Sequence, residues 1–253
     1  MNDFELLVDL HKSGARQGPG GKQQTQLAIH LAGLDKKPDL AIADIGCGTG
    51  ASTIVLAEEL NGHITAIDFL PAFLERLDQQ AAKAKLAHKI TTQAQAMEEL
   101  NIPDSSLDVI WSEGAIYNIG FEKGVRSWRN WLKPSGVLAV SELTWLTDKR
   151  PQELQDHWDH EYPEVDTAGH KISILEKQGF SVIGYFPLPT ECWLDNYYRP
   201  MQARFSEFLK RHQDNPKATA IIEAEKREIA LYETYCDYVS YGFYIARKAS
   251  AES

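Results

Sequence analysis

The fold is decided by the stretch Leu40-Ala41-Ile42-Ala43-Asp44-Ile45-Gly46-Cys47-Gly48-Thr49-Gly50-Ala51. Its first half is short and apolar, which is typical of a parallel strand covered on both faces. Three glycines at alternate positions follow, and a glycine backbone adopts positive φ and approaches a ligand without an intervening Cβ. A helix that begins at Ala51 would point its free N–H groups into the same space. The stretch therefore predicts the strand–turn–helix unit that binds nucleotides in open α/β sheets.

Two nucleotide ligands fit this turn. Gly46, Gly48 and Ala51 match the loose G-x-G-x-x-G/A pattern, which predicts NAD. Asp44 argues against NAD, because a carboxylate at the mouth of the strand repels a pyrophosphate and attracts a ligand with an ammonium and a sulfonium group. Gly50 completes a G-x-G-x-G form. Together these features favour S-adenosylmethionine (SAM); the alternative is a turn that merely connects strand to helix.

The segment Asp44-Ile45-Gly46-Cys47-Gly48-Thr49-Gly50 resembles motif I of the class I SAM-dependent methyltransferases. Within that superfamily, the chain is most similar to the small-molecule "type 11" group, which includes quinone-biosynthesis-type enzymes. The run Trp111-Ser-Glu-Gly-Ala-Ile-Tyr-Asn-Ile-Gly120 is similar to a subgroup of uncharacterised bacterial members. The resemblance implies a Rossmann-like α/β fold: a seven-stranded, mostly parallel sheet with helices on both faces, an antiparallel last strand and helical insertions.

Composition narrows the partners. The 253 residues are 43% hydrophobic and 25% charged, as in ordinary globular proteins, and the net charge of −10 provides no basic field for nucleic acid or an anionic membrane. The three cysteines are an odd number and lack metal-ligand spacing, so a disulfide framework is not expected. This favours a reducing, cytoplasmic location. We expect no secretory signal and no membrane span, since no suitable apolar run is present.

We expect a single domain over residues 1–253. Its predicted parts are an N-terminal cover (1–33), a core (34–142, 171–186 and 237–248) and two insertions (143–170 and 187–236). A short amphipathic helix near the start would place Phe4, Leu7 and Leu10 on one side. The glycine-rich segment 11–21 is either a linker or a cover that closes over SAM, with Arg16 reaching a carboxylate. The last predicted strand (238–247) is antiparallel and lies either at the sheet edge or beside the sixth strand (180–186).

Asp68 ends the second predicted strand, about twenty residues beyond the glycine turn, where a carboxylate binds ribose hydroxyls in this topology. An Asp that caps the helix starting at Pro71 is the alternative. Phe69 would flank the adenine, and the family places the adenine amine near Ala96 and Met97. The predicted cofactor set is Asp44, Gly46, Cys47, Gly48, Gly50, Asp68, Phe69, Ala96, Met97, Ser112, Glu113, Arg16 and Gly18.

Methyl transfer is an in-line displacement that depends mainly on positioning, which supplies about 7–11 kcal/mol of the barrier in favourable cases. If a general base takes part, the candidates are Glu113, Tyr117, Glu142 and His157. Both insertions are rich in Trp and Tyr, so they either roof the acceptor pocket or pack the extra helices. His157 and His160 share a helix face, but no second ligand group accompanies them, and we predict no metal.

The sequence therefore predicts a SAM-dependent methyltransferase with a small-molecule acceptor. The alternatives are a non-catalytic SAM-binding sensor and, less favoured because no Tyr-x-x-x-Lys pair is evident, an NAD-dependent oxidoreductase. The motifs of nucleic-acid base methyltransferases are absent from the sequence, which agrees with its acidic charge. The sequence leaves the acceptor and the oligomeric state open, with a homodimer as one alternative.

Overall fold

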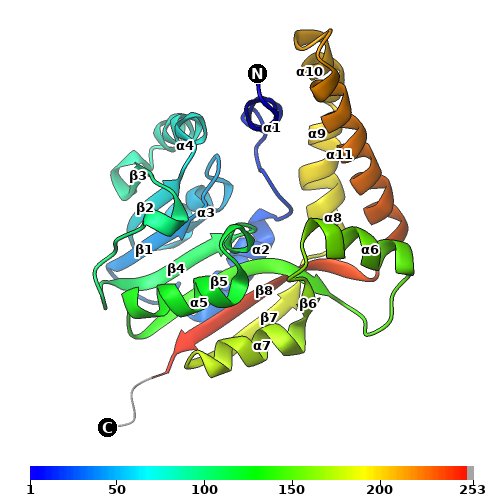
Figure 1. Cartoon of the computed structure of the whole chain (residues 1–253). Helices are drawn as coiled ribbons and strands as arrows, with labels where there is room; N and C mark the ends of the chain where they lie inside the picture. Colours follow the sequence, from blue (N-terminus) through cyan, green and yellow to red (C-terminus); the bar gives the residue numbers. More distant parts are fainter. Residues whose placement is uncertain (250–253) are drawn as a thin grey trace.

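A computed structural model describes residues 1–249 and shows one central sheet with helices on both faces (Figure 1). The strand order is β3-β2-β1-β4-β5-β8-β7, and the two-residue β6 pairs with β5 outside this path. The strands are β1 (Leu40–Ile45), β2 (Gly62–Asp68), β3 (Ile90–Ala94), β4 (Leu107–Glu113), β5 (Leu132–Trp145), β6 (Asp166–Thr167), β7 (Phe180–Pro187) and β8 (Val239–Lys248). This arrangement confirms the predicted fold class.

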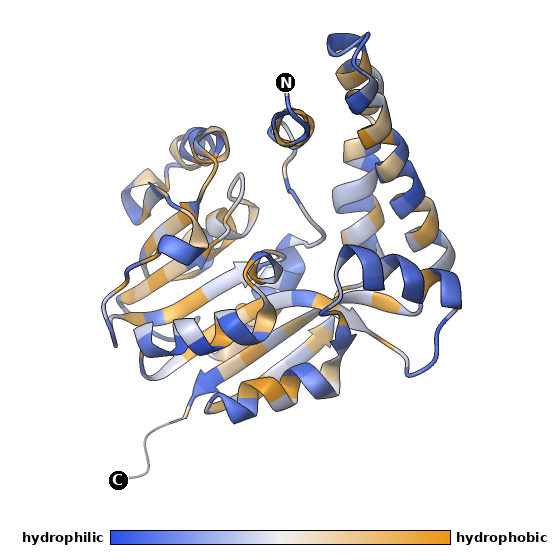
Figure 2. Ribbon diagram, viewed as in Figure 1, coloured by the Kyte–Doolittle hydropathy of each residue, from blue (hydrophilic) through white to orange (hydrophobic). Residues whose placement is uncertain are grey.

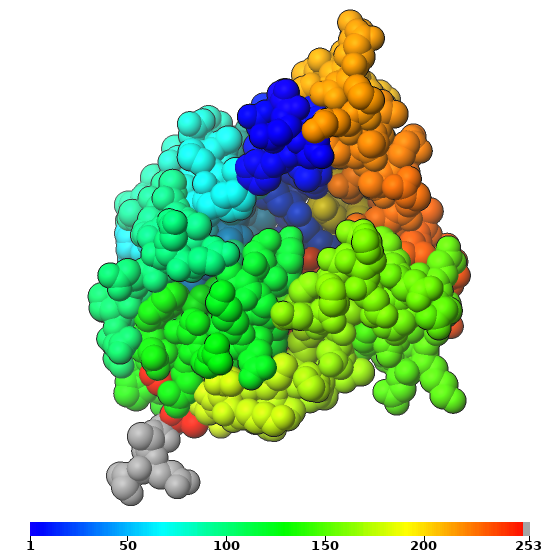
Figure 3. Space-filling model, in the orientation of Figure 1, coloured from blue at the N-terminus to red at the C-terminus, as the bar shows by residue number. Residues whose placement is uncertain are grey.

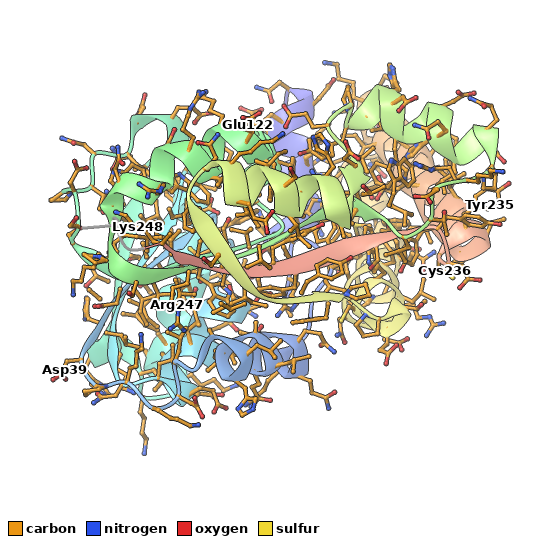
Figure 4. The ribbon with its side chains drawn as sticks, turned by 90° about the horizontal axis from the view of Figure 1, so that it is seen from below. Asp39, Glu122, Tyr235, Cys236, Arg247 and Lys248 are labelled. Carbon is orange, nitrogen blue, oxygen red and sulfur yellow. The ribbon has the colours of Figure 1, made fainter. Side chains whose placement is uncertain are left out.

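The last strand is inserted within the sheet. β8 runs antiparallel between β5 and β7 and is paired on both edges, and most of its side chains are buried. Viewed from below, β8 runs from the end near Cys236 to Arg247 and Lys248 (Figure 4). Lys248 Nζ donates to the Leu132 carbonyl at 2.6 Å and Arg247 to the Ala32 carbonyl at 3.3 Å, which ties that end to β5 and α2.

Helices cover the two faces through separate apolar clusters. On one face, α2 and α3 pack against Trp111 and Phe243, and on the other, α5 and α7 pack against Leu138 and Tyr244. Apolar residues are concentrated along the central strands (Figure 2). The helices are α1 (Asp3–His11), α2 (Lys22–Ala32), α3 (Ala51–Glu59), α4 (Pro71–Lys83), α5 (Phe121–Trp128), α6 (Gln152–Glu161), α7 (Ala168–Lys177), α8 (Thr190–Trp193), α9 (Arg199–Gln202), α10 (Phe205–Arg211) and α11 (Pro216–Tyr235).

The segments around α6 and α8–α11 form a helical arm beside the sheet (Figure 1). Its core is an aromatic cluster in which Trp193 stacks on Tyr232 with ring centroids 4.4 Å apart. Here β5 runs on to Trp145, beyond the predicted core boundary at residue 142, because its last residues pair with β8 and β6. Among residues 1–249, no helix combines the length and apolar character needed to cross a bilayer.

The first helix, α1, belongs to this arm and corrects the predicted amphipathic face. Leu6 and Leu10 are buried in the arm's cluster, whereas Phe4 and Leu7 are exposed. Asp9 fixes the orientation, since its carboxylate accepts hydrogen bonds from Arg211 Nη2 and pairs with His212 Nε2, each at 2.8 Å, on α10 and just beyond it. Phe4 and Leu7 therefore face away from the arm, toward the cavity that they line together with Phe73 of α4.

Candidate cofactor and acceptor site

A cavity of about 590 Å³ opens at the carboxyl ends of β1, β2 and β4, beneath α1. Figure 3 shows the surface hollowed below α1 at this place. Open parallel sheets bind ligands at this edge, because the strands end there and the following loops diverge. Ten predicted cofactor residues line the cavity, namely Arg16, Gly18, Gly46, Cys47, Gly48, Asp68, Phe69, Ala96, Met97 and Glu113.

Neighbouring side chains pack so closely against the glycine turn that Gly46 and Gly48 have no room for a Cβ. A Cβ at Gly46, where φ is +74°, would lie 2.3 Å from Ala115 Cβ and 2.6 Å from Met97 Cε. A Cβ at Gly48, where φ is +54°, would lie 2.4 Å from Gln17 Oε1. Both positions lie in the cavity wall, so only a residue without a side chain keeps the turn open to a ligand there.

Gly50 and Ser112 do not line the cavity, which corrects two predicted cofactor contacts. A Cβ at Gly50 would lie 2.2 Å from Leu77 Cδ1, so this glycine serves the packing of the turn against α4. Ser112 is fully buried and sits in register with Val140, on the face covered by α5 and α7. Side chains alternate along a strand, so Ser112 and Glu113 point to opposite faces, and Glu113 alone reaches the cavity.

Asp68 joins the second strand to the glycine turn. Its Oδ2 accepts the Gly48 N–H at 3.0 Å and its Oδ1 accepts the Leu70 N–H at 2.9 Å. Burial raises the pKa of this carboxyl, while the backbone donors oppose that shift. A carboxylate has about four acceptor positions, so two remain for a diol that enters the cavity. This geometry fits a ribose, as the sequence predicts.

Asp44 requires the main correction. Its side chain is fully buried and absent from the cavity lining, and its Oδ2 accepts hydrogen bonds from Ser52 Oγ at 3.0 Å and Thr53 Oγ1 at 2.7 Å. These hydroxyls belong to the first turn of α3, so Asp44 holds the helix against the strand. The predicted direct contact between Asp44 and the positive end of a ligand is therefore not supported, and the case for SAM depends on Asp68 and the turn.

Because Asp44 is buried, we expect its charge to affect stability. Burial, opposed by the Thr53 hydrogen bond and reinforced by Glu113, raises the pKa of Asp44 from 3.8 to about 7. Between these values the folded chain holds a proton that the unfolded chain has released, so the free energy of unfolding falls as pH rises, and the stabilising contribution is lost above the folded pKa.

The variant Asp44→Asn should remove this pH dependence. Relative to the variant, the unmodified chain should lose about 2 kcal/mol of unfolding free energy between about pH 5 and pH 7. Urea denaturation of both proteins at the two pH values measures the difference. Parallel stability curves would show that Asp44 is ionised throughout in the folded chain.

The glycine-rich segment 12–21 lies closed over the turn. Arg16 Nη1 donates to Glu113 Oε2 at 3.0 Å, and both side chains are largely buried. Gln17 Oε1 accepts the Thr49 N–H at 2.9 Å, and Thr49 Oγ1 donates to the Gly14 carbonyl at 3.1 Å. Arg16 therefore reaches a carboxylate, as predicted, but that of the protein's own Glu113. The cover is held by the same turn whose glycines line the cavity.

The variant Arg16→Met keeps the side-chain stem and removes the ion pair that fastens the cover. We expect about tenfold weaker SAM binding, since a charge-assisted hydrogen bond contributes about 1.5–3 kcal/mol. The matched control is Arg199→Met, which removes an exposed arginine paired with Asp195 on its own helical turn. Fluorescence titration with SAM measures both; equal affinities would show that the Arg16 pair does not hold the cover closed.

The outer walls of the cavity are apolar. Phe69 is 53% exposed, and its ring lies 5.7 Å from that of Phe4 on α1. Met97 lies against Gly46 and, with Ala96, forms the opposite wall. Sequence reasoning missed the contribution of α1, which adds Phe4, Leu7, Val8 and His11 to the lining. The apolar residues of α1 form two faces, one that packs in the arm and one that borders the cavity.

The four candidate bases occupy different environments. Glu113 is held by Arg16 and also accepts hydrogen bonds from Thr25 Oγ1 at 2.6 Å and Trp111 Nε1 at 3.0 Å. Its two oxygens are therefore already engaged by three donors. Tyr117 lines the cavity and is 43% exposed. Glu142 is buried near the end of β5, and burial raises its pKa to about 7.

His157 is not brought to the cavity, which corrects that prediction. It lies on α6 beside Trp158, with ring centroids 4.8 Å apart, and lines a separate groove between α6 and α11. His157 therefore lies on the side of α6 that faces α11. Among residues 1–249, no group of three or more His, Cys, Asp or Glu side chains could hold a metal ion.

Comparison with known proteins agrees with this geometry. Residues 42–136 match the family model Methyltransf_25, described as a methyltransferase domain. A phosphoethanolamine N-methyltransferase from Triticum aestivum is 24% identical over 198 residues, which cover 77% of this chain and 37% of the relative. The chain spans about a third to half of the length of the first curated relatives that it matches.

Solved structures share the whole fold. A SAM-dependent methyltransferase from Geobacter sulfurreducens in complex with S-adenosyl-L-homocysteine superimposes with a TM-score of 0.82 at 16% identity, covering 96% of this chain and 97% of the other. The [4+2]-cyclase SpnF superimposes with a TM-score of 0.76 at 19% identity, covering 98% and 93%. The chain therefore contains a segment that matches a methyltransferase domain, and its fold is similar to that of solved SAM-dependent methyltransferases.

Proposed function

We propose that this chain transfers the methyl group of SAM to a small-molecule acceptor. The observation that carries the proposal is the cradle at the carboxyl ends of β1 and β2, where Asp68 joins the Gly48 turn and keeps acceptor positions for a ribose. Bound SAM supplies a methyl carbon on a positively charged sulfur. The shared fold alone does not decide the reaction, because folds host many functions.

The chain's own residues position and protect the reacting groups. Asp68 would accept the ribose hydroxyls, Phe69 would cover one face of the adenine, and Ala96 and Met97 would border its other side. The Arg16–Glu113 pair closes the cover and limits the access of water. Such positioning supplies about 7–11 kcal/mol in favourable displacements, so no strong base is required at the reacting centre.

The acceptor class and location are parts of the same proposal. Names of matched relatives include phosphoethanolamine and the malonyl group of an acyl carrier protein, which supports a small acceptor group. The charge of −10 argues against a nucleic-acid acceptor. Cys47, Cys192 and Cys236 are free thiols in the structure, which supports a cytoplasmic location. A homodimer stays a prediction.

Incubation with methyl-tritiated SAM and a cell extract tests the function. We expect label in the small-molecule fraction, and none in the protein or nucleic-acid fractions above a heat-inactivated control. Binding of SAM without any labelled product would favour the sensor alternative. Label in protein or nucleic acid would overturn the proposed acceptor class.

A further inference from the structure

One face of α1 forms a wall of the cofactor cavity. Four residues of this face line the cavity, and their spacing of three or four places them in one stripe along the helix: Phe4, Leu7, Val8 and His11. At the first end of the stripe, the Phe4 ring lies 5.7 Å from the ring of Phe69. The stripe is apolar except at His11, so this wall suits the apolar body of a ligand and offers it one polar side chain.

The end of the stripe that carries His11 is connected to the glycine turn by Gln17. The Gln17 Nε2 donates to the His11 carbonyl at 3.3 Å, and the Gln17 Oε1 accepts the Thr49 N–H at 2.9 Å. A Cβ at Gly48 would lie 2.4 Å from the same Gln17 oxygen. His11 therefore borders the cavity at the glycine turn, two helical turns away from Phe4.

The His11 ring is supported from the side of the helical arm. Its Nε2 lies 3.9 Å from Glu225 Oε1 on α11, and both side chains are largely buried. The ring also stacks on the Tyr197 ring, with centroids 6.3 Å apart. His11 Nδ1 is buried and has no hydrogen-bond partner among residues 1–249. One ring nitrogen therefore lies near a carboxylate, while the other still lacks a partner.

The other titratable groups around the ring are neutral or engaged elsewhere. Burial, followed by the charges of Glu225 and Glu228, raises the pKa of Tyr197 well above its usual range, so its phenol stays neutral. Arg204, which lies near Tyr197, donates to two backbone carbonyls. Asp9 on α1 is paired with three cationic side chains. Glu225 is therefore the charged group that acts most directly on His11.

The other ionisable groups of the cavity are poor candidates for a base. Arg16 and Glu113 pair with each other, and Asp68 accepts two backbone N–H groups. Burial, followed by the charge of Glu142, raises the pKa of Tyr117, so its phenol keeps its proton at neutral pH. Among the described residues that line the cavity, Arg16 is the only lysine or arginine, so an anionic acceptor would find no free cation of this kind.

Resting on the proposed methyl transfer, we propose that His11 is its general base and that the acceptor is a neutral, apolar molecule with a weakly acidic hydroxyl group, such as a phenol. Glu225 favours the neutral tautomer with its proton on Nε2, which leaves the free electron pair on Nδ1. The same carboxylate stabilises the imidazolium that forms when Nδ1 takes a proton. A charged acceptor would instead have to lie against an apolar wall without a charged partner of its own.

The proton and the electrons balance in this step. The hydroxyl proton of the acceptor passes to His11 Nδ1. An electron pair on the acceptor oxygen forms the bond to the methyl carbon as the carbon–sulfur bond of SAM breaks, and the electrons of the broken bond remain on sulfur. The products are a methyl ether, uncharged S-adenosylhomocysteine and a His11 imidazolium beside Glu225. The imidazolium then releases its proton to solvent.

The probe that tests the base is 4-nitrophenol, whose anion is yellow and whose neutral form is nearly colourless. It is titrated into the chain saturated with S-adenosylhomocysteine, about one pH unit below the midpoint of the free probe. We expect saturable binding, with a ratio of anion to neutral probe about tenfold higher than in solution, because the proton moves to His11. The variant His11→Gln should bring this ratio back to that of the free probe, and Glu225→Gln should lower it about threefold.

The matched control is His160→Gln, which replaces an exposed histidine on α6 and should keep the higher ratio. S-adenosylhomocysteine binding is measured first in every variant, so a folding defect is recognised. An unmodified chain that did not bind S-adenosylhomocysteine would contradict the proposed function itself. A chain that bound it would overturn the His11 assignment if 4-nitrophenol did not bind, if the bound probe were ionised no more than the free probe, or if His11→Gln left the ratio unchanged.

The apolar wall is tested separately at Leu7, which is 38% exposed, so its replacement does not disturb a buried position. Leu7→Gln should weaken the binding of 4-nitrophenol and of its methyl ether, 4-nitroanisole, about threefold to tenfold, through loss of apolar contact. Leu31→Gln on α2 replaces a leucine that is 39% exposed and does not line the cavity, and it should bind both probes normally. Equal binding by the two variants would overturn the assignment of the α1 stripe to the acceptor.

Discussion

Replacement of Asp68 by Ala should weaken SAM binding about 100-fold, because two charge-assisted hydrogen bonds to the ribose are lost at about 1.5 kcal/mol or more each. The substitution also frees the Gly48 N–H, which Asp68 Oδ2 accepts at 3.0 Å, and so loosens the turn that forms the cavity wall. Equilibrium dialysis with tritiated SAM measures the affinity directly.

Two further variants separate the ribose contact from the support of the turn. Asp68→Asn keeps one carbonyl acceptor for the turn and should lose less affinity than Asp68→Ala. Asp159→Ala removes an exposed acid of α6 and should leave the affinity unchanged. If Asp68→Ala bound SAM as tightly as Asp159→Ala does, Asp68 would be only the cap of the helix that starts at Pro71.

The variant Gly46→Ala should reduce SAM binding by a similar factor, about 100-fold, and should lower the thermal midpoint of unfolding. The backbone at Gly46 has a φ of +74°, which is unfavourable for a residue with a Cβ, and the added Cβ would lie 2.3 Å from Ala115 Cβ. Ala115 follows Gly114 at the end of β4, so relief of the clash moves the cavity wall itself. Met97 Cε, at 2.6 Å, is the end of a flexible side chain and can move more easily.

The matched control is Gly169→Ala in the first turn of α7, where a Cβ would meet nothing within 4 Å. This control should bind SAM normally and unfold at the same or a slightly higher temperature. SAM titration and thermal unfolding of both variants give the comparison. Normal SAM affinity in Gly46→Ala would mean that the turn does not form the cofactor wall.

Much of the fold could be predicted from local patterns. The apolar run at 40–45, the glycines and Ala51 together determine β1, the turn and α3, because each element requires those residue types. The local pattern leaves the place of the last strand open, since alternation along residues 238–247 predicts a strand with two different faces but does not identify its neighbouring strands. β8 pairs with β5 residues about a hundred positions away and with β7 residues more than fifty positions away, and no local pattern encodes such pairings.

Site residues that end a parallel strand could be predicted from the sequence. The direction in which a side chain points within a strand could not. Asp68 and Glu113 reach the cavity as predicted, because each ends a parallel strand. Asp44 lies in β1, two residues before the first glycine of the turn, and its carboxylate accepts hydrogen bonds from the hydroxyls of Ser52 and Thr53 on α3. The prediction for His157 is wrong for another reason. α6, which carries His157, lies beside α11, and the sequence pattern does not encode that tertiary arrangement.

Calorimetric titration of the unmodified chain with SAM tests the central claim most directly, with NAD in a parallel experiment. The account predicts binding of one SAM per chain, displaced by S-adenosylhomocysteine, and no heat of binding with NAD. Binding of NAD, or the absence of binding by both SAM and S-adenosylhomocysteine, would contradict it.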